Sequence, residues 1–114
     1  MPNVQVNVDT TTTPVTITCD PDSVPMKNSG AINWTKGTIK PAGTQWSLSS
    51  VTGLPNPPFG PAQVNGNGDI QIQDTVPANG PRTPYKYTVS ITVGTQTYSL
   101  DPQIVNNPAT EDIP

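Results

Sequence analysis

Few side chains of this chain could act as a nucleophile or a general base. The sequence contains no histidine and a single cysteine, Cys19. Without an imidazole, Ser-His-Asp and Cys-His arrangements cannot form, and zinc sites built on histidine are excluded. Cys19 ends an alternating apolar segment, residues 15–19, and this position favours a buried structural thiol over an activated nucleophile. A lone cysteine also excludes a disulfide within the chain.

Paired carboxylates are the other candidates for chemistry. Asp20 with Asp22, and Asp69 with Asp74, could supply a general acid and a general base. Both pairs flank predicted turns, where aspartate accepts hydrogen bonds from the local backbone, and this structural role is favoured. We therefore expect no catalytic residue.

The segment from Asn65 to Asp74 has the spacing of a calcium loop. Asn65-Gly66-Asn67-Gly68-Asp69, with Asp74 five residues further on, offers oxygen ligands at alternate positions. Only the two aspartates carry charge, so a glycine-containing turn between strands is the favoured interpretation. We expect neither a metal ion nor another cofactor.

Aromatic residues could form a platform for a sugar ring or an anchor for a protein. Trp34 alternates with Ile32 and is predicted to be a core residue, whereas Trp46 lies on a short serine-rich strand, which leaves a surface role open. Phe59 lies in a proline-rich loop. It either folds back as a lid or stays exposed as an anchor for a partner, because a rigid loop loses little entropy on binding.

The most regular pattern, Tyr85–Leu100, predicts a β-hairpin. Between Tyr85 and Val93 every second residue is large and apolar, as a half-buried strand requires. Gly94 and Thr95 fit a two-residue turn with positive φ at the glycine. This turn predicts that three pairs share a face: Val93 with Gln96, Ile91 with Tyr98, and Val89 with Leu100.

The whole chain shows about seven short strands separated by turn signals and no helical period. The predicted fold is all-β: a two-sheet antiparallel immunoglobulin-like β-sandwich with no long helix, with a small barrel as the alternative. We expect one sandwich domain over residues 1–105 and a mobile C-terminal tail over residues 106–114.

The N-terminal strand allows two interpretations. Val4, Val6 and Val8 share one face, and pairing as an edge strand within the domain is favoured. Alternatively, Thr10–Thr13 and Pro14 form an extended spacer that lets the three valines add to the open sheet edge of a neighbouring molecule.

Composition restricts the partners. Charged residues make up 11% of the 114 residues and the net charge is −3. The five basic residues are scattered, so nucleic-acid binding is not expected, and no apolar run is long enough for a membrane helix. The N-terminus lacks the pattern of a signal peptide, which favours the cytoplasm by default and leaves non-classical export or a viral particle open.

The segment 15–19, Trp34 and the run Tyr85-Lys86-Tyr87 resemble an immunoglobulin fold. In that fold a cysteine and a tryptophan pack in the centre, and a tyrosine lies two residues before a second cysteine. The resemblance implies that Cys19 is the first cysteine, Trp34 the core tryptophan and Tyr85 the tyrosine of the corner motif. Tyr87 stands in place of the second cysteine, so the disulfide of antibody domains cannot form.

The C-terminal run Tyr98–Pro108 resembles the end of the small bacterial DP-EP family. Asp101-Pro102 matches its Asp-Pro motif, and Asn107-Pro108 replaces its Glu-Pro motif. The resemblance covers about a tenth of the chain. It implies a sandwich domain without an assigned activity.

These observations predict a non-enzymatic structural or protein-interaction module, with self-assembly or a protein partner favoured over a small ligand. The candidate partner contacts are Val4, Val6, Val8, Pro57, Pro58, Phe59 and Trp46. The alternative is a carbohydrate- or calcium-dependent binding module that uses Trp46 and the loop from Asn65 to Asp74.

Overall fold

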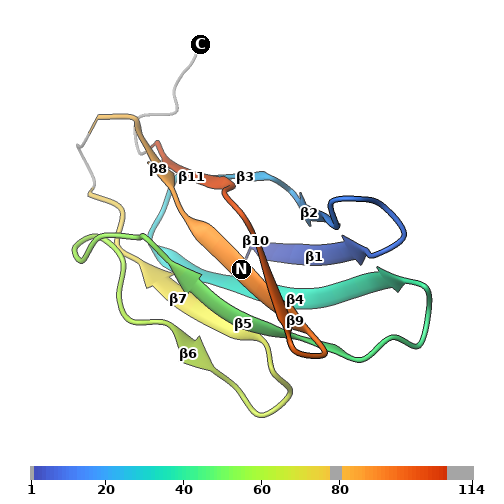
Figure 1. The fold of residues 1–114 in the computed structure, drawn as a ribbon. Coiled ribbons are helices and arrows are strands. Elements are labelled where there is room, and N and C mark those ends of the chain that lie inside the picture. The colour runs from blue at the N-terminus through green and yellow to red at the C-terminus, as the bar shows by residue number, and fades with distance from the viewer. Residues whose placement is uncertain (1, 78–80, 108–114) are drawn as a thin grey trace.

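The computed structural model describes residues 2–77 and 81–107, and within these ranges the chain is all-β with eleven strands and no helix (Figure 1). None of the described residues therefore forms a helix that could cross a membrane. The strands are β1 (Asn3–Asp9), β2 (Thr16–Asp20), β3 (Ser23–Met26), β4 (Gly30–Lys40), β5 (Trp46–Thr52), β6 (Gln63–Val64), β7 (Ile70–Asp74), β8 (Thr83–Lys86), β9 (Thr88–Val93), β10 (Gln96–Leu100) and β11 (Gln103–Asn106).

The largest sheet has five strands in the order β2-β1-β4-β7-β6. β1 pairs antiparallel with β2 and parallel with β4, so it is an internal strand with partners on both sides. The predicted alternation of Val4, Val6 and Val8 is present, and all three side chains are buried. An internal position explains this burial better than the predicted edge position.

The predicted hairpin register is confirmed. Val93 pairs with Gln96 and Val89 with Leu100, and Gly94 has a φ of 62° at the turn. β10, β9 and β5 form one three-stranded sheet, and β3, β11 and β8 form another.

A short interruption separates these two sheets, and Pro102 explains it. Lys86 pairs with Gln103 on one side of the interruption, in the same register as Val89 with Leu100 on the other. At the interruption, the Tyr87 N–H donates to the Pro102 carbonyl at 3.1 Å. Proline has no N–H group to return a bond. β8 and β9 are therefore successive parts of one arm of a long hairpin, and β10 and β11 are parts of the other.

The C-terminal boundary differs from the prediction. Asn106, expected at the start of a mobile tail, is the buried last residue of β11, and its side-chain amide donates to Asp74 at 3.0 Å. Asn107 donates its N–H to the Met26 carbonyl at 2.8 Å. The rest of the predicted tail, residues 108–114, lies outside the described residues.

One hydrophobic cluster joins all three sheets. Its largest fully buried side chains include Trp34 of β4, Tyr87 between β8 and β9, and Phe59 of the proline-rich loop. The strand count exceeds the predicted seven because short strands occur where proline and turn residues were expected to interrupt pairing. Pro25 in β3 and Pro84 in β8 are examples, and both strands lie at sheet edges, where a missing N–H is tolerated.

Candidate functional site

The N-terminal valines cannot act as partner contacts. Val4 and Val6 are 0% exposed, and Val8 is 3% exposed. Because the backbone of β1 is paired with β2 and β4, the strand has no free edge to offer a second molecule. The prediction that Val4, Val6 and Val8 contact a partner was therefore wrong, and the alternative, that their strand pairs within the chain, is confirmed.

Phe59 is a lid and not an exposed anchor. Its side chain is 1% exposed, and its ring packs edge-to-face on Tyr85 with centroids 5.0 Å apart. Its N–H donates to the Pro55 carbonyl at 3.0 Å. Of the two prolines proposed with it, Pro57 is exposed and Pro58 is half-buried. The loop therefore closes one part of the core, with prolines on its outer side.

Trp46 is half-buried at the start of β5, and a lysine covers its ring. The ammonium group of Lys36 lies 5.1 Å from the ring centroid and donates to the Trp46 backbone carbonyl at 2.7 Å. A cation over an aromatic face is a favourable contact. One face of the ring is consequently covered by a residue of its own chain.

The loop from Asn65 to Asp74 does not bring its carboxylates together. The Asn65 side chain accepts from the N–H of Asp69 at 3.1 Å, which is the behaviour of a turn residue. Asp74 lies at the far end of β7, buried against Asn106. Across residues 2–77 and 81–107, no three His, Cys, Asp or Glu side chains are grouped as a metal site requires.

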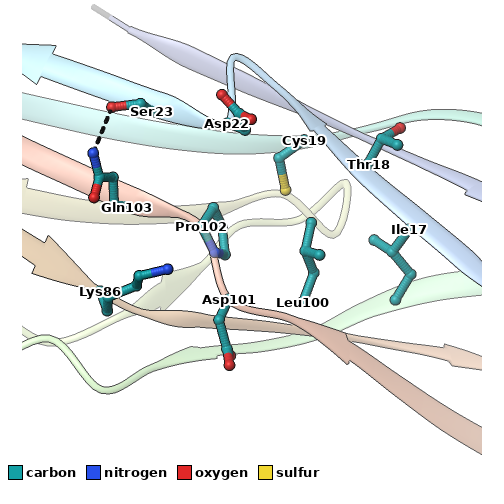
Figure 2. Close-up of a pocket in the computed structure, with 10 residues that line it drawn as sticks. All are labelled: Ile17, Thr18, Cys19, Asp22, Ser23, Lys86, Leu100, Asp101, Pro102 and Gln103. Carbon is teal, nitrogen blue, oxygen red and sulfur yellow. Dashed lines mark hydrogen bonds between the residues drawn. The ribbon is translucent and has the colours of Figure 1, made fainter.

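A groove lies between β2 and the connection from β10 to β11 (Figure 2). Its volume is about 490 Å³. Ile17, Cys19 and Leu100 supply apolar surface, and Asp22 and Lys86 lie on opposite sides. The groove combines an apolar floor with polar sides, which suits a polypeptide segment better than a reaction centre.

Three polar side chains that line this groove, those of Asp101, Gln103 and Ser23, have partners within the chain. The Thr88 hydroxyl donates to Asp101 at 2.8 Å, and the Gln103 amide donates to the Ser23 hydroxyl at 3.2 Å. Burial, followed by the negative charge of Asp22, raises the pKa of the Cys19 thiol to about 11. Since the thiolate is the nucleophilic form, Cys19 is unreactive near neutral pH.

Two of the residues carried over from the immunoglobulin resemblance, Trp34 and Tyr87, are in contact in the core. The Trp34 indole N–H donates to the Tyr87 hydroxyl at 2.9 Å, and the two rings pack edge-to-face with centroids 5.3 Å apart. Burial raises the pKa of Tyr87, opposed by the bond from Trp34, and Cys19 raises it further. Tyr87 thus occupies the centre beside the tryptophan, while Tyr85 packs on Phe59 instead.

Most sheet edges carry a feature that hinders pairing with another strand. Pro25 interrupts β3, Pro84 interrupts β8, and β6 has only two residues. β2 ends at Asp20, and β5 has a register shift after Leu48 as well as the Lys36 bond to its outer carbonyl. Natural sheets use prolines, charges, bulges and short strands in this way.

β10 has none of these features. Its five residues, Gln96-Thr97-Tyr98-Ser99-Leu100, are uncharged, lack proline and pair with β9 without a register shift. Sequence analysis missed this edge, although the signal was present. Once the Gly94-Thr95 turn is placed, the register determines which backbone groups of β10 face away from β9.

The chain matches no protein-family model, and no curated protein is significantly similar to it.

Proposed function

We propose that the chain is a non-enzymatic interaction module that binds an extended polypeptide segment by strand addition to β10. The observation that carries this proposal is the unprotected outer edge of β10, beside a groove with an apolar floor. Strand addition uses backbone hydrogen bonds for affinity and side-chain pockets for specificity.

The proposed scaffold is an immunoglobulin-like β-sandwich. The long hairpin, with β5 and β3 at its sides, would form one layer, and the five-stranded sheet would form the other. Two observations support this arrangement: β10 lies close to β2 of the five-stranded sheet, and β5 lies close to β4 and β7 of the same sheet, without strand pairing between them. The contact of Trp34 with Tyr87 joins the two proposed layers through the core.

The chemistry of the individual groups supports a role without catalysis. Cys19 holds its proton at neutral pH. Three carboxylates accept hydrogen bonds from their own chain: Asp9 from Thr11, Asp74 from Asn106 and Asp101 from Thr88. Carboxylates that already accept hydrogen bonds from their own chain have a structural role.

Selection of displayed random heptapeptides on the immobilised protein tests the proposal. We expect selected peptides to protect the backbone amides of Thr97 and Ser99 from hydrogen exchange. The matched control is the same peptide with alternate amides N-methylated on its pairing side, which should lose binding at least tenfold because one edge can no longer donate. Peptides that leave both amides unprotected, or that tolerate N-methylation, would refute strand addition.

A further inference from the structure

The hydrogen-bond register of the long hairpin determines which groups of β10 are free. The Tyr87 N–H donates to Pro102, so the bonded pairs of this hairpin fall at Tyr87 and at every second residue from there to Val93. In β10 the bonded residues are then Gln96, Tyr98 and Leu100. Thr97 and Ser99 direct their N–H and C=O groups away from β9, and both residues are exposed.

The outer edge of β10, which has no strand partner among the described residues, continues along the hairpin arm as the edge of β11 that pairs with β3. β3 pairs with β11 along the same outer side, where the Gln103 N–H donates to the Asp22 carbonyl at 3.1 Å. No described strand pairs with β10 on that side. The vacancy therefore runs from the hairpin turn to the start of β3, and the groove of Figure 2 lies at its inner end.

We propose that the occupant of this vacancy is β10 of a second copy of the chain, paired antiparallel about a two-fold axis at Tyr98. This inference rests on the proposed function and names its partner. Thr97 of each copy would lie opposite Ser99 of the other, and each pair exchanges two backbone hydrogen bonds. The two three-stranded sheets that contain β10 would then join as one continuous sheet.

The length of the vacancy favours this register. With Thr97 opposite Ser99, the Gly94-Thr95 turn of one copy reaches Asp101 and Pro102 of the other. β3 begins its pairing at the next residue, Gln103. The hairpin of the second copy would therefore end just before the residue at which β3 begins to pair with β11.

Charge and side-chain type favour a second copy as well. The chain has a net charge of −3, yet β10 carries no charge, so two copies meet at this edge without opposing like charges. The half-buried ring of Tyr98 would face its counterpart in a pair without hydrogen bonds, where side chains approach most closely. An aromatic pair at that position adds to the stability of the seam.

Sedimentation velocity of the full chain from about 10 µM to about 1 mM tests the inference, since a short seam gives a weak dimer. We expect the dimer fraction to rise over this range. The double variant Thr97→Lys/Ser99→Lys places like charges opposite one another and should weaken association at least tenfold. The variant Thr97→Lys/Ser99→Glu should restore association, because in the proposed register each introduced lysine lies opposite an introduced glutamate of the other copy.

The matched control adds two lysines to the other edge of the same sheet, as Ser47→Lys/Thr52→Lys on β5, and should associate like the parent chain. Circular dichroism and thermal melting establish that each variant is folded. A parent chain that stays monomeric throughout, or a like-charge variant that associates as well as the parent, would overturn the inference. A monomer that still binds selected peptides along β10 would overturn the second-copy inference alone and leave strand addition standing.

Discussion

Among the described residues, two buried polar contacts connect the five-stranded sheet to the long hairpin, and they differ in how many of their polar atoms have a hydrogen-bond partner. In the first, the indole N–H of Trp34 donates to the Tyr87 hydroxyl at 2.9 Å. In the second, the Asn106 amide donates to one carboxylate oxygen of Asp74 at 3.0 Å. The second oxygen of Asp74 and the side-chain oxygen of Asn106 are buried and have no partner among the described residues.

The difference follows from the number of donors and acceptors at each contact. An indole has one N–H and no acceptor, so a single bond to a hydroxyl satisfies it. A carboxylate has only acceptors, so the single bond from Asn106 leaves the second carboxylate oxygen and the amide oxygen without a donor. Burial raises the pKa of Asp74 above its ordinary value of 3.8, opposed by the bond from Asn106. A proton on Asp74 would turn one unpaired acceptor into a donor. Both side-chain polar atoms of the first contact therefore have a hydrogen-bond partner, whereas the second contact leaves two buried oxygens without one.

The largest effect is expected at the satisfied contact. Trp34→Ala should lower the free energy of unfolding by about 3–5 kcal/mol, because it removes a fully buried indole and leaves a cavity. Urea denaturation measures this loss. The control is Trp46→Ala, which removes a half-buried ring and should cost clearly less. Equal losses in the two variants would contradict the assignment of Trp34 as the centre of the core.

A smaller loss is expected from removing only the acceptor. Tyr87→Phe keeps the ring contact at 5.3 Å and leaves the Trp34 N–H buried without a partner, which should cost about 1–3 kcal/mol. Urea denaturation again supplies the measurement. In the background Trp34→Phe the same substitution should cost less, since no indole donor is left unpaired. A Tyr87→Phe protein as stable as the parent would show that the hydrogen bond contributes nothing.

Local pattern predicted part of this arrangement from the sequence. The hairpin register follows from Gly94-Thr95 and the alternation around it, because a two-residue turn and a side-chain period of two leave one consistent pairing. Trp34 was predicted to be buried for the same kind of reason, its alternation with Ile32.

The other features depend on contacts between residues far apart in the sequence, so local pattern did not predict them. The parallel partner of β1 is β4, whose residues lie about thirty positions further along the chain, so the burial of Val4 depends on Trp34 opposite it. No local pattern states that partner. Asn106 looks like a tail residue by composition, and only the pairing of β11 between β3 and β8 places it against Asp74. The burial of Phe59 also depends on a distant residue, because its ring packs on Tyr85.

The smallest effect is expected at the incomplete contact, and its sign is reversed. Asp74→Asn supplies an N–H donor where the parent has a carboxylate oxygen without a partner, and should raise the free energy of unfolding by about 1 kcal/mol at neutral pH. Chemical denaturation of both proteins over a range of pH measures the gain.

The pH dependence of that gain separates a missing proton from a general packing effect. Because the pKa of Asp74 is raised in the folded chain, the stability contributed by its protonated form is complete below the ordinary pKa of 3.8 and is lost as pH rises through the folded-state pKa. The difference between Asp74→Asn and the parent should therefore be small at acid pH and grow as pH increases. Hydrogen bonds from Thr11 lower the pKa of Asp9, but this effect is the same in both proteins and cancels in the difference. A gain that is the same at every pH would mean that folding does not shift the pKa of Asp74, and the contrast between the two contacts would then rest on packing alone.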